Sequence, residues 1–189
     1  DERVDHLVRI AHLQRDELYD HRAALESLQQ AYALRRDDLD LLHEMLDIHT
    51  QNGHWSRAVE VLERLAQLSQ GEDRARTLVA MANILAYELE SPREAVEAFD
   101  LALDEDPSDR RSFEHIQRIL ASRQDWRGLA RAYRHMIKRL GAAISVDNRA
   151  WQLSLWYDLG DLCRLELDDP HAASAAYEVC VSLAPDDPK

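Results

Sequence analysis

The segment closest to a catalytic signature is His43-Glu44-Met45-Leu46-Asp47. Zinc peptidases carry His-Glu-x-x-His on a helix, because two imidazoles four residues apart share one face and the glutamate activates a metal-bound water. Here Asp47 stands where the second His is needed, so a metal would require a third ligand from elsewhere in the fold. We interpret His43 and Asp47 as polar residues that line a groove, and we predict no metal site and no catalytic residue.

Other reactive groups give no stronger signal. The chain has no Gly-rich phosphate loop, no dinucleotide fingerprint and no Gly-x-Ser-x-Gly turn, and its 5 glycines are spaced too widely to surround a phosphate. Cys163 and Cys180 have neither metal-site nor disulfide-framework spacing, and both fall at predicted core positions, so we interpret them as inert thiols rather than a redox pair. We predict no cofactor. An enzyme remains open only as a further domain or as the incomplete His43/Asp47 site.

The residues that position these groups are predicted to be helical throughout. Apolar residues recur at spacings of three and four, and the 5 prolines lie in polar stretches where helices end. No apolar run is long enough for a membrane span, and residues 1–5 lack the features of a signal peptide. We therefore expect no membrane partner and a cytoplasmic location. The missing initiator Met suggests a piece of a longer protein.

An internal repeat organises the chain. Residues 17–24, 88–95 and 166–173 align with one another, and a second motif at 55–62 and 126–133 alternates with them. Each second helix is predicted to open on a small or apolar residue. It recurs at steps of 34, 37, 34 and 44 residues, as Ala24, Ala58, Ala95, Leu129 and Ala173. A period of 34 residues is typical of a helix–turn–helix repeat array.

These positions resemble the tetratricopeptide repeat family, whose pattern is W-x2-L-G-x2-Y followed by A-x3-F-x2-A and Pro. The resemblance covers nearly the whole chain. It implies an all-α, right-handed α-solenoid of about five tandem antiparallel helical hairpins in a single domain, 1–189. The hairpins would lie at about 1–37, 38–71, 72–108, 109–141 and 147–186.

Three details of the sequence predict local departures from a regular repeat. Leu46, Gln117 and Leu129 stand where the family prefers Gly or Ala, so the second and fourth hairpins should pack with a wider or altered crossing. The odd-numbered hairpins carry one extra residue in the internal turn. Extra residues at 142–147 predict a mobile loop or a local break in the superhelix.

The resemblance implies a ligand in a concave groove lined by the first helices. Carrying over the groove columns gives Arg9, His12, His43, Asp47, Asn83, Arg118, Tyr157 and Asp161 as candidate partner-binding residues. The cations and amides that hold a chaperone's C-terminal carboxylate are not in place, since the second hairpin offers His43, Glu44 and Asp47. The polar groove of mixed charge favours a peptide or helix of a partner protein, held by hydrogen bonds and charge pairs.

Charge is distributed unevenly. The chain carries −13, yet residues 109–140 hold eight Arg and one Lys against three carboxylates. The rest of the chain is therefore strongly negative, and this charge disfavours nucleic acid as a partner. A stripe of Arg127, Arg131, Arg134 and Lys138 follows one helix face. It is either a solvated surface or a site for an acidic partner.

Two further expectations concern exposed apolar groups. The last hairpin is rich in Val, Leu and Ala through Val179, Val181 and Leu183, although the ends of a repeat array need polar caps. Further repeats or a second copy would cover this edge, so a homo-oligomer formed by end-stacking is an alternative function. Trp151 fits no repeat column and is the aromatic residue most suited to an exposed contact, with loop packing as the alternative.

Overall fold

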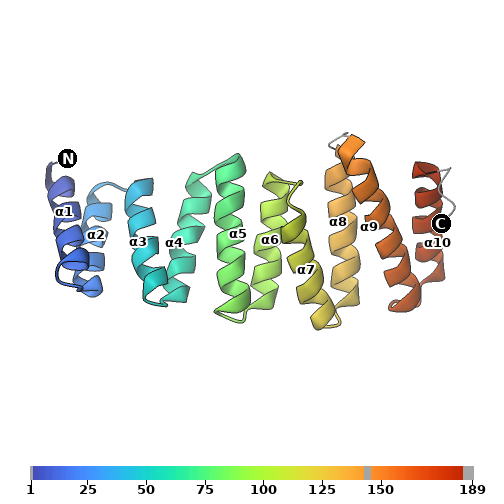
Figure 1. Ribbon diagram of the computed structural model, residues 1–189, viewed down its shortest axis with the longest axis horizontal. Helices are drawn as coiled ribbons and strands as arrows, with labels where there is room; N and C mark the ends of the chain where they lie inside the picture. Colours follow the sequence, from blue (N-terminus) through green and yellow to red (C-terminus); the bar gives the residue numbers. More distant parts are fainter. Residues whose placement is uncertain (1, 143–145, 185–189) are drawn as a thin grey trace. The chain divides into compact units, whose positions relative to one another are not determined.

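The computed structural model describes residues 2–142 and 146–184, which form ten helices and no strand (Figure 1). The first five are α1 Glu2–Asp16, α2 His21–Leu34, α3 Leu39–Gln51, α4 Trp55–Leu68 and α5 Gly71–Tyr87. The second five are α6 Pro92–Glu105, α7 Arg110–Ser122, α8 Trp126–Ala142, α9 Val146–Leu165 and α10 Pro170–Leu183. The predicted all-α array of five helical hairpins is therefore confirmed.

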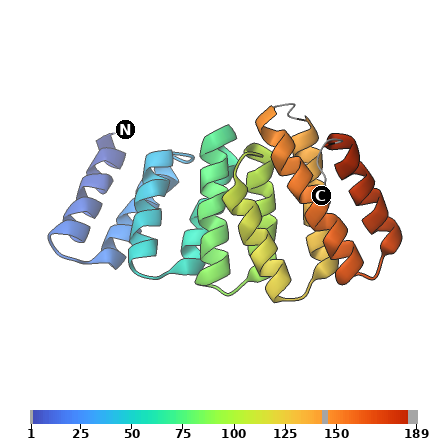
Figure 2. The ribbon, with the colours of Figure 1, turned by 45° about the vertical axis from the view of Figure 1, so that its right-hand side comes forward.

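The helices gather into two compact units. Unit 1 is residues 1–98 and contains α1 to α5 and the start of α6, whereas unit 2 is residues 99–189 and contains the end of α6 and α7 to α10. Within each unit a helix packs chiefly on the helices before and after it in the sequence, as Figure 2 shows for the pairs α1/α2 and α9/α10. The single domain over 1–189 and the right-handed superhelix stay predictions.

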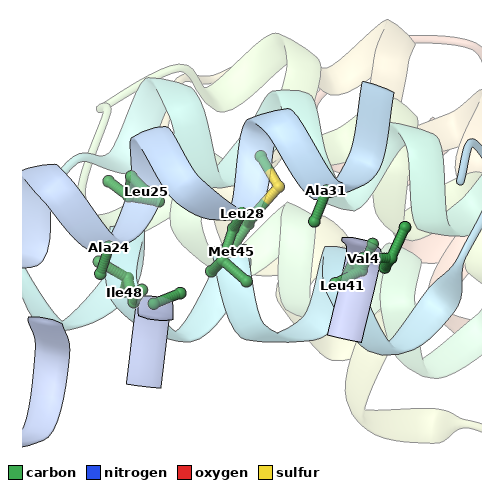
Figure 3. Close-up of a cluster of buried hydrophobic side chains, with 9 residues drawn as sticks. Val4, Ala24, Leu25, Leu28, Ala31, Leu41, Met45 and Ile48 are labelled. Carbon is green, nitrogen blue, oxygen red and sulfur yellow. The ribbon is translucent and has the colours of Figure 1, made fainter. Parts of the chain in front are cut away.

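The core of unit 1 includes the layer between α2 and α3 (Figure 3). Leu28 and Ala31 of α2 and Ile48 of α3 are no more than 1% exposed, and Met45 is 8% exposed. Their spacing of three and four residues puts each set on one helix face, which is why the pattern could be read from the sequence. Full burial of a Leu or Ile side chain contributes about 1.5–3 kcal/mol.

The core of unit 2 is more aromatic. The ring of Phe113 meets that of Tyr133 edge-on, with centroids 5.4 Å apart, and Phe99 stacks on His115 at 5.1 Å. Gln117, which replaces the expected small residue, donates its amide to the hydroxyl of Tyr133 at 2.7 Å. This bond satisfies a half-buried amide that the helix contact would otherwise leave unpaired. The wider crossing of the even-numbered hairpins stays a prediction.

All five internal turns share one backbone feature. Each has a residue with positive φ five positions before the small or apolar residue that opens the second helix, namely Tyr19, Gly53, Glu90, Gln124 and Asp168. The odd-numbered turns close with a hydrogen bond from residue i to i−6, as in Asp20 N–H to Gln14 O, and the even-numbered turns with i to i−5, as in His54 N–H to His49 O. This difference confirms the extra residue predicted in the odd-numbered turns.

Aspartates begin half of the helices. The side chains of Asp20, Asp38, Asp109, Asp125 and Asp169 accept hydrogen bonds from free backbone N–H groups at the starts of α2, α3, α7, α8 and α10. Each such cap stabilises its helix by about 1 kcal/mol. Part of the predicted loop or break at 142–147 lies outside the described residues, because α8 ends at Ala142 and α9 begins at Val146.

Trp151 is a packing residue. Its side chain is half-buried, its ring meets that of Phe113 at 6.5 Å, and the guanidinium of Arg110 lies 4.8 Å from the ring centroid. A cation over an indole face is attracted by the ring quadrupole. The exposed contact suggested for Trp151 is thus replaced by the packing alternative.

Candidate partner-binding site

A hollow of about 320 Å³ lies between α1 and α3 in unit 1. Val8 and Leu41 supply its apolar surface. Its polar lining comes from both helices and the segment between α2 and α3: Asp5, Arg9, His12, Arg35, Asp38, Asp40 and Glu44. Mixed apolar and charged lining of this kind suits a peptide that presents side chains of both types.

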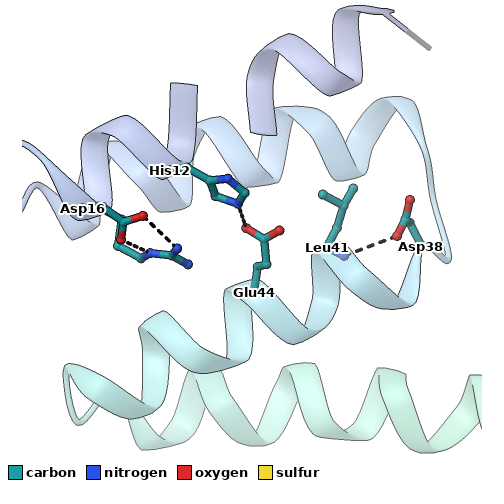
Figure 4. A network of polar contacts seen from close by, with 6 residues as sticks. His12, Asp16, Asp38, Leu41 and Glu44 are labelled. Atoms are coloured by element: carbon teal, nitrogen blue, oxygen red, sulfur yellow. Dashed lines mark hydrogen bonds and ion pairs between the residues drawn. The ribbon is translucent and has the colours of Figure 1, made fainter. Parts of the chain in front are cut away.

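Part of this lining is already paired within the chain. His12 Nε2 lies 2.7 Å from Glu44 Oε2 and joins α1 to α3, as Figure 4 shows. Arg35 lies 3.2 Å from Asp38 and 3.6 Å from Asp5. Such pairs fix the positions of these side chains in the lining of the hollow.

Two charged side chains that line the hollow do not form such pairs. The side chains of Arg9 and Asp40 are exposed, and neither forms a hydrogen bond or ion pair with another residue in the described part of the chain. A partner could thus pair with both without first breaking an internal contact. One cation and one anion on the rim would select a segment that carries both charges.

A further ion pair continues along α1. Arg15 donates two hydrogen bonds to Asp16, at 2.7 and 3.1 Å (Figure 4). The bond to Arg15 lowers the pKa of Asp16, and the same bond, with smaller contributions from Glu44 and Asp47, raises the pKa of Arg15.

The structure brings together only some of the predicted groove residues. Arg9 and His12 line the α1/α3 hollow, while Tyr157 and Asp161 line a second hollow in unit 2. His43, Asp47 and Arg118 are exposed and Asn83 is half-buried, and none of these four lines either hollow. The binding role of the eight residues stays a prediction.

The second hollow, of about 410 Å³, lies on the open side of α9 and α10. Its apolar lining is Leu153, Tyr157, Cys180, Val181 and Ala184, and its polar lining is Asp161, Arg164 and Tyr177. Tyr177 donates its hydroxyl to Asp161 at 2.7 Å, and Arg164 donates to the same carboxylate oxygen at 3.0 Å. Both bonds lower the pKa of Asp161.

The basic stripe lies on α8. All four side chains, Arg127, Arg131, Arg134 and Lys138, are exposed, and none forms a hydrogen bond or ion pair with another described residue. Arg139 of the same helix behaves differently. It is only 12% exposed and binds Asp100 and Asp104 of α6 at 2.8 and 2.7 Å, so these two carboxylates are already paired within the chain.

The cysteines are buried and free. Burial raises the pKa of both thiols, which keeps them protonated and unreactive. Within residues 2–142 and 146–184 no group of three His, Cys, Asp or Glu side chains is placed to hold a metal ion. In the same residues, no helix combines the length and apolarity needed to cross a membrane.

Several lining residues could not be found by carrying over groove columns. Arg35 and Asp38 lie between α2 and α3, outside the first helices from which the columns were taken. Tyr177 belongs to a second helix, and it is half-buried and lines the α9/α10 hollow. The apolar character of Val181 in a last hairpin was the signal for this second hollow.

Five helical hairpins with a shared register and close packing between neighbours define the chain as a helical repeat scaffold. Comparison with protein families matches residues 17–82 and 153–187, together just over half of the chain, to the tetratricopeptide repeat. The chain belongs to the tetratricopeptide repeat family, which is generally a non-catalytic protein-interaction module.

Solved structures agree on the fold. A crystal structure of MamA aligns with a TM-score of 0.51 at 11% identity, covering 97% of this chain and 93% of MamA. A structure described as a MamA RS-1 ArsTM double mutant aligns with a TM-score of 0.50 at 14% identity, covering 98% and 96%. Comparison with curated protein sequences finds no match.

Proposed function

We propose that the chain binds a peptide or helix of a partner protein along the first helices of its hairpins, and that the α1/α3 hollow is the contact in unit 1. The observation that supports this is the pair Arg9 and Asp40, whose exposed side chains border an apolar surface without internal partners. Val8 and Leu41 would receive an apolar side chain, and the two charges would orient the segment.

The His12–Glu44 contact would hold the two helices at the spacing that the ligand meets. A preformed site of this kind spends little free energy on ordering when it binds. Membership of an interaction family makes a protein partner the natural ligand, while the net charge of −13 argues against nucleic acid.

The test is the selection of binding peptides from a displayed random library on the intact chain, followed by calorimetry with each selected peptide. The variant Arg9→Gln should weaken binding about tenfold, as expected for one charge-assisted hydrogen bond. Arg22→Gln is the matched control, because Arg22 of α2 is also an exposed Arg, at 90%, and lies outside the hollow. Equal affinities of the two variants for every selected peptide would rule out the hollow.

A second contact is proposed at the basic stripe of α8, for an acidic segment of a partner. The observation that favours it is that four exposed cations on one face have no described counter-charge, although the neighbouring helix is acidic. Like charges spaced three and four residues apart repel by a few tenths of a kcal/mol per pair. An acidic ligand would relieve this repulsion.

A further inference from the structure

A third hollow, of about 350 Å³, lies in unit 2 between the α7/α8 turn and the α9/α10 turn. Figure 1 shows both turns at the same end of this unit. One wall is formed by Gln124, Asp125, Trp126 and Arg127, and the other by Glu166 and Leu167. The helix α8, which begins at the first turn, packs on α9, which ends at the second, so the two walls are held together.

The apolar surface of this hollow consists of Trp126 and Leu167, one from each wall. Both side chains are half-buried, so part of each is in contact with solvent. Among the described residues, Trp126 forms no ring contact and its indole N–H donates no hydrogen bond. The hollow therefore offers an apolar contact to one side chain of a ligand.

The charged groups of the hollow differ in what they already bind. Asp125 caps α8 by accepting a hydrogen bond from Gly128 N–H at 2.8 Å, beside the positive end of the helix dipole. Arg127 and Glu166 are exposed, and neither side chain forms a hydrogen bond or ion pair in the described part of the chain. The hollow thus has one free cation on one wall and one free anion on the other.

The hollow is continuous with the basic stripe of α8. Arg127 lines the hollow and is also the first residue of the stripe, whose last residue is Lys138. The helix rises about 16 Å between these two residues, a distance that about five residues of an extended segment span. A single short segment could therefore reach from the hollow to the far end of the stripe.

From these groups we infer which acidic segment the chain takes, an inference that rests on the stripe contact proposed above. The segment has one large apolar residue in the hollow, acidic residues along the stripe, and a Lys or Arg on the other side of the apolar residue. A wholly acidic segment that entered the hollow would place a carboxylate beside Glu166 and Asp125, whereas a Lys or Arg would pair with Glu166. An apolar side chain between Trp126 and Leu167 leaves water without breaking an internal polar contact.

The probes are synthetic peptides, acetylated and amidated, with the sequence Lys-Leu-Glu-Glu-Gly-Glu-Glu or its reverse, and the same two peptides with Ser in place of Leu. Calorimetry on the intact chain measures the four affinities. In at least one direction the Leu peptide should bind about tenfold tighter than its Ser counterpart, as expected for burial of one Leu side chain. This ratio should persist at high salt, which weakens charge pairs but not the apolar contact.

Trp126→Gln should remove the advantage of the Leu peptide and leave the affinity of the Ser peptide unchanged. Trp55→Gln is the matched control, because Trp55 is the half-buried first residue of α4, at the same repeat position in unit 1. Leu167→Gln changes the other wall and should act like Trp126→Gln, so the test does not depend on one variant. Glu166→Gln should weaken binding about threefold relative to Glu88→Gln, which removes the same charge at the equivalent exposed position of unit 1.

The stripe contact has its own readout, which is the loss of Ser-peptide binding in Arg131→Glu with Arg134→Glu. If that loss occurs while Leu and Ser peptides bind equally, the stripe contact stands and the inference about its ligand is overturned. An equal Leu advantage in Trp126→Gln, Leu167→Gln and Trp55→Gln would overturn it as well. Binding of no peptide at all would remove both the stripe contact and the inference.

Discussion

At the scale of single residues, the ring of Tyr177 packs so closely on Gly160 of α9 that no larger residue fits there. A Cβ built at Gly160 would lie 2.6 Å from Tyr177 Cε1, closer than real contacts allow. The ring cannot move freely because its hydroxyl is bonded to Asp161. Gly160→Ala should therefore lower the free energy of unfolding by about 1–2 kcal/mol, despite the better helix propensity of Ala.

Urea unfolding followed by circular dichroism measures this change. Gly141→Ala is the control, because the nearest atom to a Cβ there is Gln152 Nε2 at 3.9 Å. That variant should be neutral or stabilised by up to about 1 kcal/mol. If Gly160→Ala is as stable as Gly141→Ala, close approach of α9 and α10 does not require the glycine.

His49 makes the stability of unit 1 sensitive to acid. Its side chain is 6% exposed, and Nδ1 is buried without a hydrogen-bond partner among the described residues. Burial lowers the pKa of His49, and His54 and Arg57 of α4 lower it further, while Glu60 opposes them. Below the unfolded-state pKa of about 6.5 the unfolded chain therefore binds a proton that the folded chain resists, and stability falls as pH falls.

His49→Gln removes this titration. Urea unfolding at pH 7.5 and at pH 5.5 should show a smaller loss of stability for His49→Gln than for the wild type. His43→Gln, at an exposed position of the same helix, should keep the wild-type loss. The same loss in all three proteins would mean that other groups dominate the acid response.

The core residues could be predicted from the sequence, whereas much of the binding surface could not. Leu28, Met45 and Leu159 repeat at fixed positions because burial selects residue type and size. Arg35 and Asp38 of the α1/α3 hollow follow no such rule, since a surface charge is placed by the path of the chain between helices. Repeat positions on the first helices therefore do not predict them.

At the scale of the elements, the prolines and polar stretches of the sequence predict where helices end, but they do not predict the backbone conformation of the turns. Of the five residues with positive φ in the internal turns, only Gly53 is a glycine. Tyr19, Glu90, Gln124 and Asp168 adopt the same conformation at a cost of about 1–2 kcal/mol each. The register of two packed helices fixes each turn, so residue type alone gives no signal there.

The α8 stripe offers a prediction at this scale. Arg131→Glu with Arg134→Glu should leave the melting temperature nearly unchanged, because the described structure pairs neither side chain. Binding of an acidic probe, a synthetic oligoglutamate, should nevertheless fall at least tenfold by calorimetry, and wild-type binding should fall steeply with salt.

Arg22→Glu with Arg93→Glu is the matched control for the stripe. Both arginines are at least 90% exposed and lie on other second helices, α2 and α6. This pair removes the same charge from the whole chain. Equal loss of oligoglutamate binding in the two double variants would show that only the net charge of the chain matters. The stripe would then be a solvated surface and not a binding site.

At the scale of the whole chain, what the sequence could not predict is the division into two compact units. The repeat register runs through residues 92–105 without interruption, and every hairpin has its expected core residues. Repeat periodicity reports only on contacts between neighbouring helices. It does not report on how strongly one group of hairpins is coupled to the next.

Because packing is local, the loss of stability caused by a core substitution should be confined to the unit that contains it. Leu28 is fully buried between α2 and α3, so Leu28→Ala should cost about 2–5 kcal/mol. Each helix packs chiefly on its sequence neighbours, so the loss should fall on unit 1. Amide hydrogen exchange under native conditions should accelerate about 30-fold or more in α1 to α3, and less than about twofold in α9 and α10. Leu159→Ala in α9 should give the reverse pattern. Uniform acceleration in both variants would show that the chain unfolds as one cooperative body.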